Sequence, residues 1–236
     1  MGRHRTARQR RGSSPLHLLG LSIPGGVQTD EEANQYLNGY GTNAGGVSLN
    51  PYHAGDAKYE DINHDGIIDD NDKQNLGSSF PWLTYGLNLS ADWKGLDLSL
   101  FFQGVAGAKV YNMMRTRTEG SGLQTQLSTD MVNVWTPDNV DGTIPNPKGN
   151  SANTSYSSRF VENANYLRLK NVQLGYTLPN NIARHLGMSR CRVYATVSNL
   201  LTFTKYKGYD PEVGSGIDYG NYPQSRTYLF GINLSF

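Results

Sequence analysis

Alternation of apolar residues with polar or small ones, at a period of two, is the feature that most constrains the fold of this chain. Between residues 83 and 93, apolar side chains occupy every second position: Leu83, Tyr85, Leu87, Leu89, Ala91 and Trp93. A period of two places these residues on one face of a β-strand and the intervening residues on the other. Lys94 and Gly95 then make a tight turn, and residues 96–103 alternate in the same way. This stretch predicts a β-hairpin with one apolar face.

Three further segments carry strand patterns, at residues 166–178, 190–204 and 226–236. The sequence therefore predicts about five strands of about ten residues each. Short connections at 94–95 and 179–188 alternate with long ones at 104–160 and 205–224. We expect a short helix near 128–135 and a helical turn within 179–188. Alternating short and long connections are typical of outer-membrane barrels, which have short periplasmic turns and long outer loops.

We interpret the chain as all-β, a partial (about five-stranded) antiparallel transmembrane β-barrel segment with long outer loops. The apolar face would meet lipid, and aromatic residues near strand ends, such as Trp82, Trp93 and Tyr176, would form an interfacial girdle. The chain has no run of about 18 apolar residues, so a transmembrane helix is not expected. Five strands cannot close, because such barrels begin at about eight strands, so we expect a larger barrel of which this is the C-terminal part. A soluble antiparallel sandwich, whose strands also alternate, is the alternative fold.

The stretch DINHDGIIDDND, residues 61–72, has the residue order of a calcium-binding loop. The predicted ligands are the side chains of Asp61, Asn63, Asp65 and Asp72 and the backbone carbonyl of Ile67, with Gly66 at the sharp turn. Residues 52–60 show no helical pattern, so a paired EF-hand is not predicted. The expected cofactor is calcium, bound weakly because the closing residue is Asp rather than the longer Glu. The alternative is a solvated loop of Asx turns.

Five stretches together resemble the C-terminal barrel segment of the SusC/RagA-type TonB-dependent outer-membrane transporters. They are GDAKYEDINHDGIIDDNDKQNLG, FPWLTYGLNLSADWKGLDLSLFFQGVAG, RFVENANYLRLKNVQLGYTLP, VYATVSNLLTFTKYKGYDPEV and SRTYLFGINLSF. In order they cover about residues 28–236. The resemblance implies a plug inside a barrel of about 22 strands. It also implies a SusD-type lipoprotein lid, and import of oligosaccharides or peptides energised through TonB.

The resemblance implies that the chain is a fragment of such a receptor in the cell outer membrane and contributes the last barrel strands. The alternating residues at its end would form the signal read by the barrel assembly machinery, although a plain lipid-facing strand gives the same pattern: Tyr228, Phe230, Ile232, Leu234 and Phe236. No catalytic residue carries over, since the family are transporters rather than enzymes. The implied partners are outer-membrane lipid, the lid, TonB, the assembly machinery and the substrate. The net charge of +1 gives no bulk attraction to nucleic acid.

The alternative function is a secreted, calcium-stabilised β-sandwich that binds carbohydrate. In either case, tyrosines of the long loops would stack on sugars, pack on one another or contact a lid protein: Tyr206, Tyr209, Tyr219 and Tyr222.

Before the resembling part, residues 1–12 hold five Arg and no acidic residue. The apolar run LHLLGL that follows is shorter than the core of a signal peptide, which has about 7–15 residues. A basic nucleic-acid-binding arm is one alternative. We interpret residues 1–27 as a non-matching, disordered or artefactual N-terminus. Residues 28–79 are then an outer loop with a helix from a capping box at Thr29–Glu32 to about Leu37 and with the acidic loop, and residues 80–236 hold the barrel strands.

Overall fold

The computed structural model of the chain describes residues 17–26, 28–37, 53–65, 68–120, 126–147 and 151–236. It divides into two compact units. The sheet unit comprises residues 81–108, 163–212 and 221–236, and the loop unit comprises residues 1–80, 109–162 and 213–220. Among the described residues, no helix is both long enough and apolar enough to cross a membrane.

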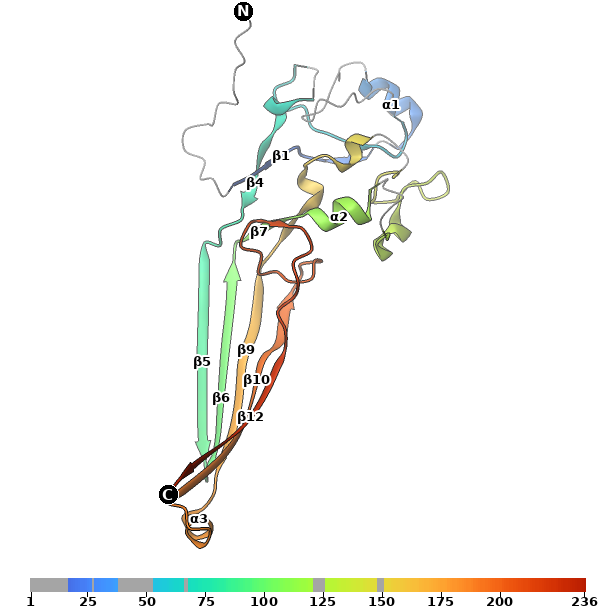
Figure 1. The fold of residues 1–236 in the computed structure, drawn as a ribbon. Coiled ribbons are helices and arrows are strands. Elements are labelled where there is room, and N and C mark those ends of the chain that lie inside the picture. Colours follow the sequence, from blue (N-terminus) through green and yellow to red (C-terminus); the bar gives the residue numbers. More distant parts are fainter. Residues whose placement is uncertain (1–16, 27, 38–52, 66–67, 121–125, 148–150) are drawn as a thin grey trace, which may run out of the picture. The chain divides into compact units, whose positions relative to one another are not determined.

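The sheet unit is built on one antiparallel sheet of five strands in the order β12-β10-β9-β6-β5 (Figure 1). The strands are β5 (Leu83–Trp93), β6 (Leu96–Ala106), β9 (Tyr166–Thr177), β10 (Arg190–Thr204) and β12 (Thr227–Ser235). A short helix, α3 (Asn180–His185), lies in the connection between β9 and β10. The predicted antiparallel, five-stranded all-β architecture is confirmed, and β5 and β10 have the predicted bounds.

The register of the strands places their apolar residues side by side on one face. Leu98 of β6 lies opposite both Ala91 of β5 and Leu174 of β9. Further along the sheet, Val193 of β10 lies opposite Ile232 of β12. Directly opposed apolar side chains stabilise neighbouring strands, and the alternation seen in the sequence thus becomes a continuous apolar face.

The register shifts once, at the same level in three strands. Positions 169 and 171 of β9 pair with the consecutive residues Phe102 and Phe101 of β6, which leaves Lys170 as an extra residue. On the other side of β9, positions 199 and 200 of β10 lie opposite Lys170. Asn199 has a φ of 54°, a left-handed conformation that Asn tolerates better than most residues. Such a bulge bends the strands and restores the alternation beyond it.

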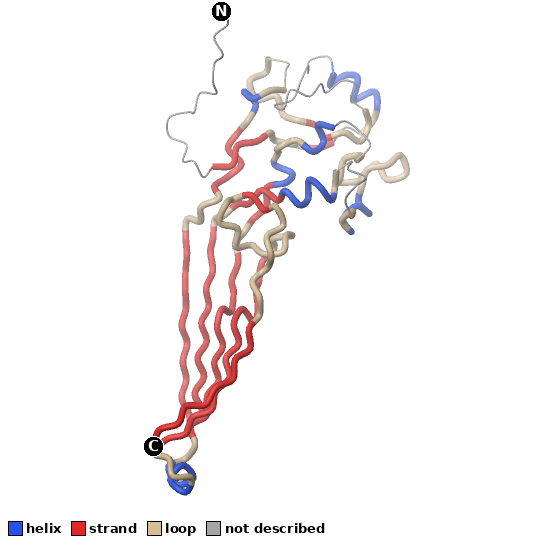
Figure 2. Tube along the Cα trace, viewed as in Figure 1, coloured by secondary structure: helices blue, strands red, loops and turns tan. Residues whose placement is uncertain are grey.

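The loop unit consists of short strands and helices joined by loops (Figure 2). Its described residues form three small sheets, in which β1 pairs with β4, β2 with β3, and β7 with both β11 and β8. The strands are β1 (His17–Gly20), β2 (Gly25–Gly26), β3 (Ala57–Lys58), β4 (Gln74–Ser78), β7 (Lys109–Asn112), β8 (Val161–Asn163) and β11 (Ile217–Asp218). The helices are α1 (Asp30–Leu37), α2 (Met113–Thr118) and four 3₁₀ turns at Asp70–Asp72, Thr129–Asn133, Ser151–Thr154 and Ser158–Phe160. The helix expected near 128–135 is therefore a 3₁₀ turn.

Aromatic rings and one shared carboxylate hold the loop unit together. The ring of Tyr111 stacks on that of Tyr156 with centroids 3.8 Å apart. The buried carboxylate of Glu119 accepts hydrogen bonds from Arg115 Nε at 2.6 Å and from Arg159 Nη2 at 2.7 Å. Because α2 carries Arg115 and the 3₁₀ turn before β8 carries Arg159, the charge-assisted bonds tie these two elements together.

The predicted N-terminal capping of α1 is confirmed in part, because Thr29 caps the helix but Glu32 reaches back to the residue before Thr29 rather than to Thr29 itself. The Thr29 hydroxyl accepts a hydrogen bond from the backbone N–H of Glu32 at 3.1 Å, and the Glu32 carboxylate accepts one from the N–H of Gln28 at 2.9 Å. The second bond lowers the pKa of Glu32. Upstream, residues 17–20 and 25–26 form β1 and β2, so this part of the segment predicted to be disordered has defined structure. Residues 1–16 and residue 27 lie outside the described residues.

Candidate functional site

One face of the sheet unit is apolar along its length and exposed. The exposed apolar residues include Leu87 and Leu89 of β5, Leu174 of β9 and four residues of β12, namely Tyr228, Phe230, Ile232 and Leu234. An exposed apolar surface of this extent marks a site of contact with a partner protein or a membrane. The outermost strands, β5 and β12, are each paired on one side only within the described part of the chain. The face and both edges therefore present surfaces that can bind a partner.

The opposite face of the sheet is polar. Arg192 donates a hydrogen bond from Nε to Asp97 at 2.9 Å, and its guanidinium lies 5.1 Å from the centroid of the Tyr194 ring. The pair lies over Gly175, where a Cβ would meet both the guanidinium and the carboxylate. Gly231 likewise leaves room for the Tyr194 ring. Glycine at these two places lets large polar side chains lie close against the strands.

Arg168 of β9 is the buried centre of a polar cluster, the Arg168 clasp, which comprises Arg168, Thr202, Asp210 and Glu212. The Arg168 side chain is 2% exposed. It donates to Asp210 at 2.8 Å through Nη2, to Glu212 at 3.0 Å through Nη1 and to the Thr202 hydroxyl at 2.9 Å through Nε. A buried guanidinium with each of its three nitrogens bonded is a well-satisfied charge. The clasp ties the segment after β10 to strands β9 and β10.

Asp210 extends the clasp to a second segment. Its carboxylate also accepts hydrogen bonds from the backbone N–H groups of Gln224 at 3.0 Å and Glu212 at 2.9 Å. Burial raises the pKa of Asp210, but these two bonds and the Arg168 guanidinium outweigh it, so that the pKa lies below its ordinary value. Nothing in the sequence pattern indicated the partners of Arg168; the signal available was a charged residue between Leu167 and Leu169, near the start of a predicted strand.

The acidic loop, residues 61–72, is folded on its own polar side chains. Asp61 Oδ1 accepts a hydrogen bond from the N–H of His64 at 2.8 Å, and Asn63 Oδ1 accepts one from the N–H of Asp65 at 3.0 Å. Asn63 Nδ2 donates to Asp65 Oδ2 at 2.8 Å. His64 has a φ of 57°, which the tight turn requires. Three of the predicted ligands thus lie on one short run of Asx turns.

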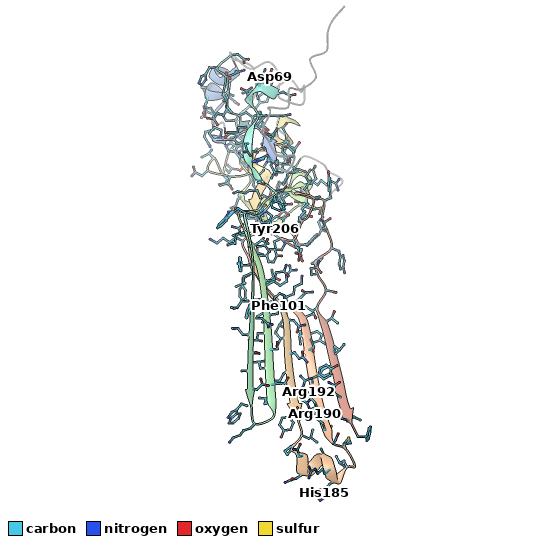
Figure 3. All side chains as sticks on the ribbon, turned by 90° about the vertical axis from the view of Figure 1, so that its left-hand side faces the viewer. Asp69, Phe101, His185, Arg190, Arg192 and Tyr206 are labelled. Carbon is cyan, nitrogen blue, oxygen red and sulfur yellow. The ribbon has the colours of Figure 1, made fainter. Side chains whose placement is uncertain are left out.

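Asp72 closes this loop by hydrogen bonding. Its carboxylate is fully buried and accepts from the N–H of Ile62 at 2.9 Å and from the N–H of Asp69 at 2.8 Å. Asp69, labelled in Figure 3, caps the 3₁₀ turn that follows. The predicted ligand Ile67 lies outside the described residues, and within those described no group of three or more acidic, His or Cys side chains is placed so that it could hold a metal ion. The donors are the hard oxygens that calcium prefers, and calcium binding stays a prediction.

The tyrosines expected to contact sugars differ in exposure. Tyr206 is buried and packs over Gly208, which is in keeping with packing inside the protein rather than stacking on a sugar. Tyr209 and Tyr222 of the sheet unit and Tyr219 of the loop unit are exposed. Their rings are accessible to a ligand or to a partner protein.

The loop unit also contains a cavity of about 490 Å³, lined among others by Gly25, Gly26, Gln28, Trp135, Asp141, Thr143, Ser158 and Arg159. Its volume is within the range of small-molecule sites, about 300–1,000 Å³. Arg159 in its lining is already paired with Glu119.

The chain is similar in sequence to several TonB-dependent receptors. The TonB-dependent receptor P26 of Formosa agariphila is 36% identical over 199 residues, which cover 79% of this chain and 20% of the relative. The TonB-dependent receptor SusC of Bacteroides thetaiotaomicron is 32% identical over 181 residues, which cover 75% of this chain and 17% of the relative. The chain thus spans about a fifth of the length of the curated relatives it matches. No protein-family profile matches the sequence.

Among solved structures, the RagAB peptide transporter is similar in fold, with a TM-score of 0.70 and 29% identity over 93% of this chain and 23% of that chain. The RagAB peptide importer in its closed-closed state gives a TM-score of 0.68 and 31% identity over 92% of this chain. Sequence and fold therefore point to the same group of proteins.

Proposed function

The chain is homologous to part of the TonB-dependent receptors of the SusC/RagA type, and on this premise we propose that it forms part of the wall of an outer-membrane barrel that imports oligosaccharides or peptides. The wall would consist of the five strands of the sheet unit. The chain would act in transport rather than in catalysis.

The observation that carries this function is a sheet with one exposed apolar face, one polar face and two open edges. In lipid, apolar side chains are stable on the outside of a barrel and polar ones on the inside. Each open edge needs a partner strand, because unpaired backbone groups in hydrocarbon cost several kcal/mol apiece. The five strands would therefore pair at β5 and β12 with further strands of a larger barrel. The exposed apolar face also disfavours the soluble sandwich, which would bury it against a second sheet.

Partners and substrate follow from the relatives and belong to this proposal. TonB would supply energy, and a SusD-type lipoprotein would cover the outer opening. The solved structures with similar fold are peptide importers by description, which supports peptides among the two substrate classes. The five alternating residues from Tyr228 to Phe236 would be read by the barrel assembly machinery before β12 pairs with its next strand.

Lipid contact can be tested residue by residue on β12. The full chain carries one cysteine, Cys191, which is first replaced by alanine. Single cysteines at Ile232 and Asn233 are then labelled with an environment-sensitive fluorophore, and the chain is refolded into phosphatidylcholine vesicles. We expect blue-shifted emission, quenched by brominated lipid, at position 232 but not at 233. Equal emission at both positions in the vesicle-associated chain would refute a barrel wall.

We propose further that calcium binds the acidic loop and rigidifies it. Support comes from the run of Asx turns that presents Asp61, Asn63 and Asp65 together. Isothermal titration with Ca²⁺ should show weak binding that D61N/D65N abolishes. The matched control is D70N, since Asp70 is exposed and pairs with Lys73. Absence of binding in the unaltered chain would leave a solvated loop.

A further inference from the structure

The end of the sheet unit that carries the short connections forms a surface with a distinctive composition. This short-turn end comprises the Lys94–Gly95 turn, the connection 178–189 with α3, and the ends of β10 and β12. The register brings these parts together, because Trp93 lies opposite Leu96 and Leu96 lies opposite Tyr176. Likewise Arg190 lies opposite Ser235. Figure 1 shows α3 and the C-terminus at the same end of the five strands.

Cationic side chains outnumber acidic ones at this end. Lys94, Arg184 and Arg190 are exposed, and none of them forms an ion pair with another described residue. No Asp or Glu occurs in residues 93–96 or 178–191. The nearest acidic side chains along the strands are those of Asp92 and Asp97, and Asp97 is bound to Arg192. Arg190 and His185, both labelled in Figure 3, lie at this end as well.

Apolar side chains surround these cations. Trp93 is 70% exposed and Leu186 60% exposed. The Lys94 ammonium lies 5.0 Å from the centroid of the Trp93 ring. In and after α3, Ala183 is buried, whereas Ile182 and Leu186, four residues apart and hence on one side of the helical turn, are exposed. Phe236 at the end of β12 is exposed as well.

We infer that the short-turn end binds the anionic headgroups of a phospholipid layer, an inference that rests on the membrane location proposed above. Trp at the boundary of an apolar face positions that boundary at headgroup level. Lys and Arg beside such a ring bury their stems in the apolar layer and extend their charge to phosphate. Exposed cations that form no ion pair are attracted to an anionic membrane surface and gain nothing comparable from a zwitterionic one.

The test uses the full chain refolded with vesicles of phosphatidylcholine alone or mixed with phosphatidylglycerol, and measures its partition by co-sedimentation at low salt. We expect stronger partition into the anionic vesicles. The variant K94Q/R184Q removes one cation from each short connection. It should lose up to about 25-fold of that preference, at about fivefold per charge. The matched control K205Q/R226Q removes the same charge near the opposite ends of β10 and β12 and should keep the preference.

The outcomes separate this inference from the membrane location itself. Equal partition of the unaltered chain into both kinds of vesicle overturns the inference and leaves the barrel wall standing. Equal loss of the preference for anionic vesicles in both variants also overturns the inference, because the preference would then depend on net charge rather than on the position of the cations. No partition into either vesicle overturns both. Circular dichroism checks that each variant keeps its β-structure. If K94Q/R184Q does not, the single variants R184Q and K205Q replace the double ones, and their preferences for anionic vesicles should differ about fivefold.

Discussion

Replacing Arg168 with methionine should open the segment after β10 while leaving the strands in place. Methionine is close to the arginine stem in length and fills the buried volume, so the change removes charge and hydrogen bonds rather than packing. Asp210, buried beside it, loses its cation, and the Thr202 hydroxyl loses its donor. The variant therefore isolates the contribution of the Arg168 clasp.

The expected magnitude follows from burial. Removing one partner of a buried ion pair costs about 3–5 kcal/mol. The lower end applies here, because Asp210 keeps the two backbone donors of Gln224 and Glu212. A cost of about 3 kcal/mol corresponds to a rise of roughly 100-fold in the population of the open segment.

Hydrogen exchange of the full chain in detergent measures this population directly. The N–H groups of Glu212 and Gln224 are bonded to the Asp210 carboxylate, so their exchange should accelerate roughly 100-fold in R168M. K170M is the matched control, because Lys170 is a partly exposed cation of the same strand whose Nζ lies 3.6 Å from Glu212. Such a pair contributes about 0–1 kcal/mol. Similar acceleration in both variants would show that the buried guanidinium does not hold the segment.

Three more predictions concern other parts of the chain. The folded-state pKa of Asp210 is lowered. Its contribution to holding the segment after β10 should therefore be complete above about pH 5 and be lost as pH falls below about 4. Hydrogen-exchange rates, corrected for their intrinsic pH dependence, should show this loss in the unaltered chain and not in D210N. G175A should lower the free energy of unfolding by about 1–3 kcal/mol, since its Cβ would separate Arg192 from Asp97; urea titration should find G86A less destabilised, because the nearest atom to a Cβ at Gly86 is 3.5 Å away. Deleting Phe236 should slow assembly into membranes if the end of β12 is a recognition signal, whereas replacing the exposed Leu186 with alanine should not; equal assembly rates for both variants would count against that role.

Local and periodic features of this protein were predictable from its sequence. The bounds of β5 and β10 follow from a period of two over many residues, and the capping of α1 follows from the spacing of Thr29 and Glu32. These features depend on interactions between residues a few positions apart, so a short stretch of sequence is enough to predict them. The residue order of the acidic loop is local in the same sense, and it predicts the Asx turns that the structure shows.

The Arg168 clasp and the bulge at Lys170 were decided only by the tertiary structure. The partners of Arg168 lie 34 to 44 residues away along the chain, and the identity of a buried charge's partner depends on which strands and loops meet. The bulge depends on the pairing of β9 with both β6 and β10, which no single strand pattern specifies. The burial of Tyr206 has the same origin, because burial is a property of the assembled segment. Composition and period thus determine the strands and the chemistry of each face, whereas contacts between segments distant in sequence determine which polar groups are buried and paired.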